Sequence, residues 1–143
     1  MSTVTDLHAA VKQGDLEPLR RLLEHNPGLA NARSETDTRG TYPLHVAAEF
    51  GQAAAAALLL AHGADVSHLD LENDATALSW AAFFGRPEAT RVLLQAGSDA
   101  KHRNRHGLTA LDCALGGARG QWQRFSNASL EDWQRCAELL QQR

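Results

Sequence analysis

Four copies of one short helical frame recur along this chain of 143 residues. The clearest copy covers residues 42–51, where Pro43 suits the first position of a helix and Gly51 suits its end. The lead leucines of the four copies lie 37, 34 and 33 residues apart and are Leu7, Leu44, Leu78 and Leu111. A helix of this length is unstable alone in water, so the copies are expected to pack against one another.

A second apolar block follows each frame and predicts a second helix beside the first. The four blocks cover residues 16–23, 53–60, 87–94 and 136–140. Together with the Pro-Leu-His-Val-Ala-Ala element at residues 43–48, this organisation resembles the ankyrin repeat family. That family has a period of 33 residues and the signature Thr-Pro-Leu-His-x-Ala. The resemblance covers about residues 5–143.

The resemblance implies an all-α fold, an ankyrin repeat solenoid of four helix-turn-helix repeats with β-hairpin-like finger loops. It also implies a single ankyrin repeat domain over residues 1–143, with an inserted loop in the last repeat. The expected repeats cover about residues 5–36, 37–69, 70–103 and 104–143. The finger loops are expected near residues 33–41, 66–75 and 100–108.

The local sequence also predicts helix ends and core positions. Thr5 is expected to cap a helix over about residues 6–13, and the four surplus residues of the first spacing are expected at 33–40. The resemblance implies that His45 ties its repeat to the neighbouring turn by hydrogen bonds and that Trp80 points inward. The leucines expected to be buried between repeats are Leu44, Leu59, Leu78, Leu93 and Leu139.

The last repeat is about 13 residues longer than the frame requires, and we place the insertion at residues 116–127. Its aromatic residues, Trp122 and Phe125, are expected to fold over the apolar end of the stack as a cap. The alternative is that the insertion is a loop that binds a partner. Ser129 is expected to cap the final helix, because acidic residues follow it in the first turn.

Composition narrows the class of protein. The net charge of −3 argues against a nucleic-acid-binding protein, which needs a dominant basic face. The longest apolar run, residues 53–61, is about half the length of a membrane span, and residues 1–30 contain no secretory signal. We therefore expect a cytoplasmic protein without a cofactor or metal, in which Cys113 and Cys136 stay reduced. A redox-sensitive pair of these cysteines is the alternative.

The resemblance implies a monomeric, non-catalytic module that holds a protein partner on a concave surface of fingers and inner helices. In the family, the two residues before each helix-ending glycine face this surface. An acidic finger at 65–74 and a basic finger at 101–106 are expected to orient the partner. The residues predicted to contact the partner are Arg39, Glu49, Phe50, Glu72, Phe83, Phe84, Arg103, Arg105 and His106.

The sequence leaves other interpretations open. The three phenylalanines could tuck between helices instead of forming an exposed strip, and the alanine run at residues 53–57 could form a binding groove on the back of the stack. The chain could be a small enzyme or a metal-dependent protein with its site at the 116–127 insertion or at the basic finger. It could also be a self-associating structural stack.

Overall fold

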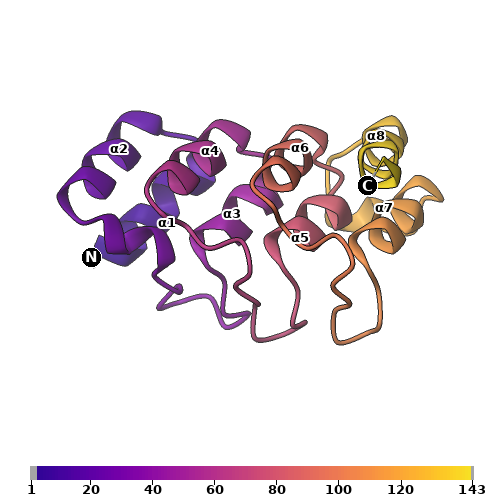
Figure 1. The fold of residues 1–143 in the computed structure, drawn as a ribbon, viewed down its shortest axis with the longest axis horizontal. Coiled ribbons are helices and arrows are strands. Elements are labelled where there is room, and N and C mark those ends of the chain that lie inside the picture. Colours follow the sequence, from indigo (N-terminus) through magenta and orange to yellow (C-terminus); the bar gives the residue numbers. More distant parts are fainter. Residues whose placement is uncertain (1–2, 143) are drawn as a thin grey trace.

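The structure, a computed structural model, describes residues 3–142. The helices are α1 (Thr3–Gln13), α2 (Leu16–His25), α3 (Pro43–Phe50), α4 (Ala53–Ala61), α5 (Ala77–Phe83), α6 (Pro87–Gln95), α7 (Ala110–Ala118) and α8 (Leu130–Gln141), with short 3-10 turns η1 (Pro27–Asn31) and η2 (Gln123–Phe125). The odd-numbered helices form an inner row, the even-numbered helices form an outer row, and three fingers project from one side (Figure 1). No β-strand occurs in the described part of the chain, so the predicted all-α stack of four helix pairs is confirmed.

The core follows the interfaces between successive helix pairs, because each inner helix packs against the next. Four of the predicted core leucines are buried: Leu44, Leu59, Leu78 and Leu93. The prediction for Leu139 is wrong, since this side chain is partly exposed and Leu140 is buried instead. The inward face of α8 is set by Trp133 and Cys136, which are both 0% exposed, and Leu140 continues that face at helical spacing.

Helix ends follow the local sequence in most places. Pro43 begins α3, and Gly51, at φ +68°, ends it in the left-handed conformation that glycine adopts without steric cost. Ser129 caps α8 as predicted, because its side chain accepts a hydrogen bond from the backbone N–H of Asp132. The prediction that Thr5 caps the first helix is wrong, since α1 begins at Thr3 and contains Thr5.

One backbone hydrogen bond crosses each finger and gives it a hairpin-like shape. The N···O distances are 2.8 Å from Ser34 to Thr41, 3.1 Å from Asp70 to Ala75 and 2.9 Å from Asn104 to Leu108. The first finger is the longest, because its bond joins residues seven positions apart, against five and four in the other fingers, as predicted for the surplus at 33–40. The turn η1 precedes this finger, and there Pro27 needs no N–H partner and the side chain of Asn26 accepts from the N–H of Gly28.

A recurring side-chain hydrogen bond joins each repeat to the one before it. Gln52 Nε2 donates to the carbonyl oxygen of Lys12 at 3.0 Å, and Arg86 Nε donates to that of Glu49 at 2.9 Å. Both donors directly follow the glycine that closes their own inner helix. At the last junction the equivalent donor is a residue of α8, Trp133.

Histidines tie two inner helices to the fingers that follow them. His45 accepts the N–H of Tyr42 at Nδ1 and donates from Nε2 to the carbonyl of Ala75 at 2.9 Å, which confirms its predicted structural role. His8 Nε2 lies 2.8 Å from the carbonyl oxygen of Ala32. Burial lowers the pKa of His45 to about 4 and also lowers the pKa of His8. Both rings are therefore neutral at pH 7.

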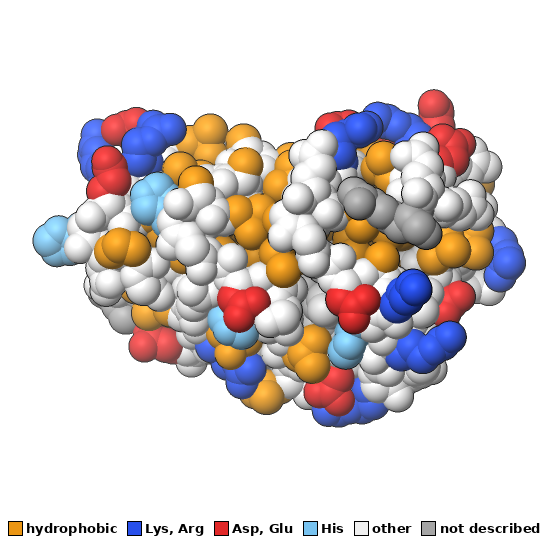
Figure 2. All heavy atoms as spheres, in the orientation of Figure 1, with side chains coloured by type: hydrophobic (Ala, Val, Ile, Leu, Met, Phe, Trp, Pro, Cys, Tyr) orange, Lys and Arg blue, Asp and Glu red, His pale blue; other side chains and the backbone are white. Residues whose placement is uncertain are grey.

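The alanine run of α4 has a buried face and an exposed face. Ala55 and Ala56 are buried and allow close packing of the repeats, whereas Ala54 and Ala57 are exposed. Figure 2 shows hydrophobic side chains over α4, between charged clusters over α2 and over α6 and α8. Although α4 is entirely apolar, no helix within residues 3–142 is both long enough and apolar enough to cross a membrane.

Candidate functional site

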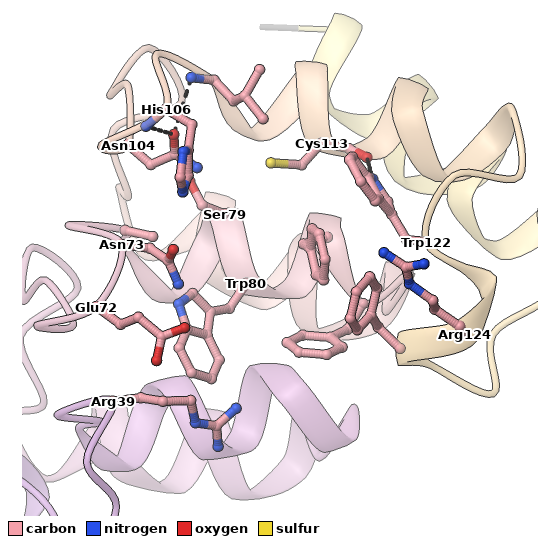
Figure 3. Close-up of a pocket in the computed structure, with 15 residues that line it drawn as sticks. Arg39, Glu72, Asn73, Ser79, Trp80, Asn104, His106, Cys113, Trp122 and Arg124 are labelled. Atoms are coloured by element: carbon pink, nitrogen blue, oxygen red, sulfur yellow. Dashed lines mark hydrogen bonds between the residues drawn. The ribbon is translucent and has the colours of Figure 1, made fainter.

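A cavity of about 510 Å³ opens on the finger side of the stack. It lies between the second and third fingers, α5, α7 and the loop that follows α7 (Figure 3). Its volume falls within the range of about 300–1,000 Å³ that is typical of ligand sites. Five aromatic side chains line this aromatic groove: Trp80, Phe83, Phe84, Trp122 and Phe125.

Phe83 is the centre of the aromatic cluster. Its ring centroid lies 4.9 Å from that of Trp122, 5.7 Å from that of Phe125 and 5.1 Å from that of Phe84. These separations are typical of favourable aromatic pairs. Trp122 is fixed further by a 2.8 Å hydrogen bond from its Nε1 to the carbonyl oxygen of Cys113. The loop after α7 is therefore held against both α5 and α7.

Two glycines explain how the loop and α8 come so close to α7. A Cβ on Gly116 would lie 2.8 Å from the ring of Trp122, and a Cβ on Gly117 would overlap the ring of Trp133. Both glycines are inside α7, so the boundary predicted for the insertion at 116–127 is wrong, and α7 continues to residue 118. The cap prediction is also wrong, because the aromatic rings of the loop pack against α5 on the groove side.

A buried carboxylate organises the second finger beside the groove. Asp70 is 1% exposed and accepts hydrogen bonds from the N–H groups of Asn73 and Ala75 and from Trp80 Nε1, at 2.8, 2.9 and 3.1 Å. Trp80 is itself buried, as predicted, and still lines the groove. The acidic finger at 65–74 thus has one of its carboxylates inside the protein, where it fixes the finger instead of meeting a partner.

The charge of Arg39 is balanced within the protein. Its guanidinium carbon lies 4.8 Å from the centroid of Trp80, and its Nη2 donates to Asp37 at 2.8 Å and to Glu49 at 3.0 Å. These bonds, led by the one to Asp37, raise the pKa of Arg39, and Arg39 in turn lowers the pKa of Asp37. The carboxylate of Glu49 is already engaged in this ion pair, whereas the sequence predicts that Glu49 contacts the partner.

Arg105 joins the third finger to the second. Its side chain donates to the carboxylate of Asp74 at 3.1 Å and to the carbonyl oxygens of Leu71 and Glu72 at 3.1 and 2.9 Å. Arg103 donates to a carbonyl of its own finger at 2.8 Å. The acidic and basic fingers therefore pair in part with each other. They are not the two independent charged rims that the sequence predicts.

The structure brings five of the nine predicted contact residues to the groove: Arg39, Glu72, Phe83, Phe84 and His106. The other four do not line it: Glu49, Phe50, Arg103 and Arg105. Phe50 is 37% exposed and lies near Lys12, whose Nζ is 5.2 Å from the ring centroid. Phe83 and Phe84 are half-buried, because the loop after α7 packs against this end of α5. The three phenylalanines therefore do not form the single exposed strip that the sequence predicts.

The groove also contains aromatic and polar residues outside the nine predicted contacts, three of them in the 116–127 insertion that the sequence keeps open as an alternative site. These are Asn73, Trp80, Asn104, Trp122, Arg124 and Phe125. The sequence places Trp80 in the core and places Trp122 and Phe125 over the end of the stack. The signal that could have placed Trp122 here is Gly116 in α7, since a helix surface without a side chain allows a large ring to approach closely.

The residues of this site do not favour a bound metal ion or a reactive cysteine. Within residues 3–142, no group of three His, Cys, Asp or Glu side chains could hold a metal ion. Cys113 and Cys136 are free and buried, and burial raises the pKa of their thiols to about 12 and about 11. Both are therefore protonated at pH 7, whereas nucleophilic cysteines need a lowered pKa.

The fold and the groove define a class of protein: a helical-repeat solenoid whose fingers and inner helices form one preformed surface. Two family models match the chain, one described as "Ankyrin repeats (3 copies)" over residues 3–70 and one described as "Ankyrin repeats (many copies)" over residues 78–121. The chain belongs to the ankyrin repeat family, as the sequence predicts. Ankyrin repeats are in general non-catalytic modules for protein–protein interaction. The second match ends one residue before Trp122.

The chain is also similar to three curated proteins. Each is named ARF GTPase-activating protein GIT1, and they come from human, mouse and rat. Each is 41% identical to this chain over 75 residues. The matched segment is 52% of this chain but only 9% of each relative, so the similarity extends over a small part of those proteins.

Proposed function

We propose that this protein is an interaction module that binds an extended segment of a partner protein in the aromatic groove. The observation that carries this proposal is the cluster of five aromatic side chains around Phe83, on the finger side of an ankyrin stack. Phe125, at 48% exposed, and the half-buried Trp122 leave apolar area for an incoming side chain. Large aromatic groups in a fixed pocket commonly supply most of the energy of a protein interface.

The walls of the groove are fixed before any partner arrives. On the loop side, Trp122 is bonded to the carbonyl of Cys113, and Ser126 Oγ donates to the carbonyl of Phe84 at 2.7 Å. On the finger side, the buried carboxylate of Asp70 bonds to the backbone of its own finger and to an indole of α5. A surface that is already ordered loses little conformational entropy on binding, which favours affinity.

We further propose that the module acts as a monomer in the cytoplasm, without a catalytic role and without nucleic acid, membrane or cofactor as its ligand. The net charge of −3 disfavours nucleic acid, and two free buried thiols suit a reducing compartment. The curated relatives are named as activators of the ARF GTPase. We transfer no activity from them, because the shared segment is 9% of their length.

Two exposed phenylalanines offer a matched test of the proposed surface. Phe125 lines the groove and is 48% exposed, while Phe50 lies outside the groove and is 37% exposed. Phe125→Ser and Phe50→Ser remove the same ring from comparable environments. Tagged wild-type protein and both variants would capture partners from lysate of the cells that produce the protein, after their melting temperatures have been compared.

We expect Phe125→Ser to capture at least about tenfold less partner than the wild type does. One buried aromatic anchor commonly contributes more than about 1.4 kcal/mol to the free energy of binding. We expect Phe50→Ser to capture as much as the wild type. Equal capture by Phe125→Ser, or loss of capture only with Phe50→Ser, would move the binding surface away from the groove.

A further inference from the structure

We infer that the aromatic groove is electrically polarised and selects a segment whose apolar anchor stands between a basic residue and an acidic residue. This inference rests on the proposed function, and it adds the chemistry of the partner. Glu72 and Arg124 lie on opposite sides of the groove, with aromatic rings between them (Figure 3). A bound segment that crosses the rings therefore meets a carboxylate at one end and a guanidinium at the other.

The Glu72 side carries a net negative charge. Glu72 is exposed, and its carboxylate is paired with no cation within residues 3–142. Beside it, Arg39 forms ion pairs with both Asp37 and Glu49, so the three side chains together carry a net charge of about −1. Asp74, the other surface carboxylate near this end, is already matched by a guanidinium of the third finger. A basic side chain of a partner would find an unbalanced carboxylate here.

The opposite side carries a net positive charge. Arg124 is exposed and lies over the ring of Phe125, 4.8 Å from its centroid. Across the described residues, no carboxylate pairs with Arg124. Arg119, also exposed, lines a smaller neighbouring cavity on which Trp122 also borders. An acidic side chain of a partner would meet a guanidinium that lies over an aromatic ring and whose fork of N–H donors suits a carboxylate.

The rings and the two charges would have different roles in binding. The apolar anchor, seated against the aromatic cluster around Phe83, would supply most of the affinity. The exposed charges would fix the direction of the segment and accelerate encounter, and salt would weaken this contribution. A segment with acidic residues at both ends would place one of them beside Glu72, and a segment with two basic residues would place one beside Arg124. Both arrangements are repulsive.

Selection from a displayed random-peptide library tests the inference and does not require the natural partner to be identified. The bait is the full chain, and selected peptides are kept only if Phe125→Ser weakens them. We expect a consensus with an apolar residue between Lys or Arg on one side and Asp or Glu on the other. Affinities of the synthesised peptides would then be measured by isothermal titration calorimetry at two salt concentrations.

Charge reversal gives the decisive comparison. We expect Glu72→Lys and Arg124→Glu each to weaken a consensus peptide about fivefold at low salt, and less at high salt. The double variant should bind a peptide with its two charges exchanged about as well as the wild type binds the original peptide. Glu138→Lys and Arg21→Glu, on the exposed faces of outer helices, are matched controls and should leave affinity unchanged.

The two possible failures are distinguishable. Peptides that depend on Phe125 but carry no such charge pattern, or that ignore both reversals, would overturn the polarity and leave the groove as the binding surface. A selection in which every peptide binds Phe125→Ser as tightly as the wild type would overturn the proposed function itself. Exchange of partner preference in the double variant supports both.

Discussion

The ends of α3 and α5 occupy the same place in the repeat frame, yet their surroundings differ. The carbonyl of Glu49 at the end of α3 accepts a hydrogen bond from Arg86 Nε, 2.9 Å away, and the neighbouring Phe50 stays exposed. The equivalent carbonyl of Phe83 at the end of α5 accepts a 2.9 Å hydrogen bond from Trp133 Nε1. The frame position that supplies the donor at the earlier junctions is Arg119 in the last repeat, and there it is exposed.

This difference shows how the longer last repeat changes the surface at its junction with the third repeat, where the aromatic groove lies. In the last repeat the donor comes from α8, whose Trp133 indole bonds to the carbonyl of Phe83 and packs against Gly85 and Gly117. The loop after α7 brings Trp122 and Phe125 against Phe83. The position of Phe50, which is exposed in the second repeat, corresponds to Phe84 in the third, which is half-buried and lines the groove. Sequence similarity between repeats does not predict equal surfaces when the next repeat differs.

The largest expected effect comes from the tryptophan that holds the last junction. Trp133 is 0% exposed and packs against Gly85 and Gly117. We expect Trp133→Ala to lower the free energy of unfolding by about 3–5 kcal/mol, because it leaves a large cavity and an unpaired carbonyl. Trp133→Phe keeps most of the ring and should cost about 1–2 kcal/mol. Urea unfolding measures both, and losses below about 1 kcal/mol for both variants would show that the junction does not depend on this residue.

Acid should weaken the histidine-linked junctions and spare the last one, where Ser79 occupies the position of His45. The pKa of His45 is about 4 in the folded protein, below the value of 6.5 for the exposed ring. Protons therefore bind the unfolded chain first, so the stabilisation is complete above pH 6.5 and is lost as the pH falls toward 4.

We expect the free energy of unfolding to fall by about 2 kcal/mol between pH 7.5 and pH 5 because of His45. Urea titrations at both pH values measure the change. His45→Gln should be less stable at pH 7.5 but should lose less between the two pH values. An unchanged pH dependence in this variant would assign the acid sensitivity to other groups.

The arginine at the second junction should have a smaller effect. Arg86 donates to the carbonyl of Glu49 and, at 2.7 Å, to Asn127 Oδ1 in the loop before α8. Arg86→Met keeps the apolar part of the side chain and removes both bonds. We expect a loss of about 1–2 kcal/mol of stability, together with faster hydrogen exchange in the loop. A stability loss without faster exchange would mean that Asn127 does not hold the loop in place.

The first junction should show the smallest effect, because its bond is exposed. Gln52 Nε2 donates to the carbonyl of Lys12 at 3.0 Å where water can replace it. We expect Gln52→Met to cost about 0.5 kcal/mol in a denaturant titration. A cost equal to that of Arg86→Met would show that these junctions are energetically alike, and the contrast between the ends of the inner helices would then have no effect on stability.

Much of the fold could be predicted from local sequence, because local residues decide it. Pro43 and Gly51 define both ends of α3, and Ser129 defines the start of α8. The candidate site was predictable only in part. Phe83 and Phe84 belong to the groove as family positions suggest, but Phe50 has the same signal and lies outside it. The difference depends on a loop about 40 residues further along the chain.

The sequence by itself determined the four repeats, their helix pairs and most of their buried leucines, since each repeat carries its own periodicity and its own helix-ending residues. Only the tertiary structure decided where the loop after α7 packs, which carboxylates are already paired, and which aromatic rings meet. Arg105 joins Asp74, and Trp133 joins the carbonyl of Phe83, across 31 and 50 positions of sequence. Such contacts depend on the shape of the assembled stack, because no periodicity within one repeat specifies a partner in another.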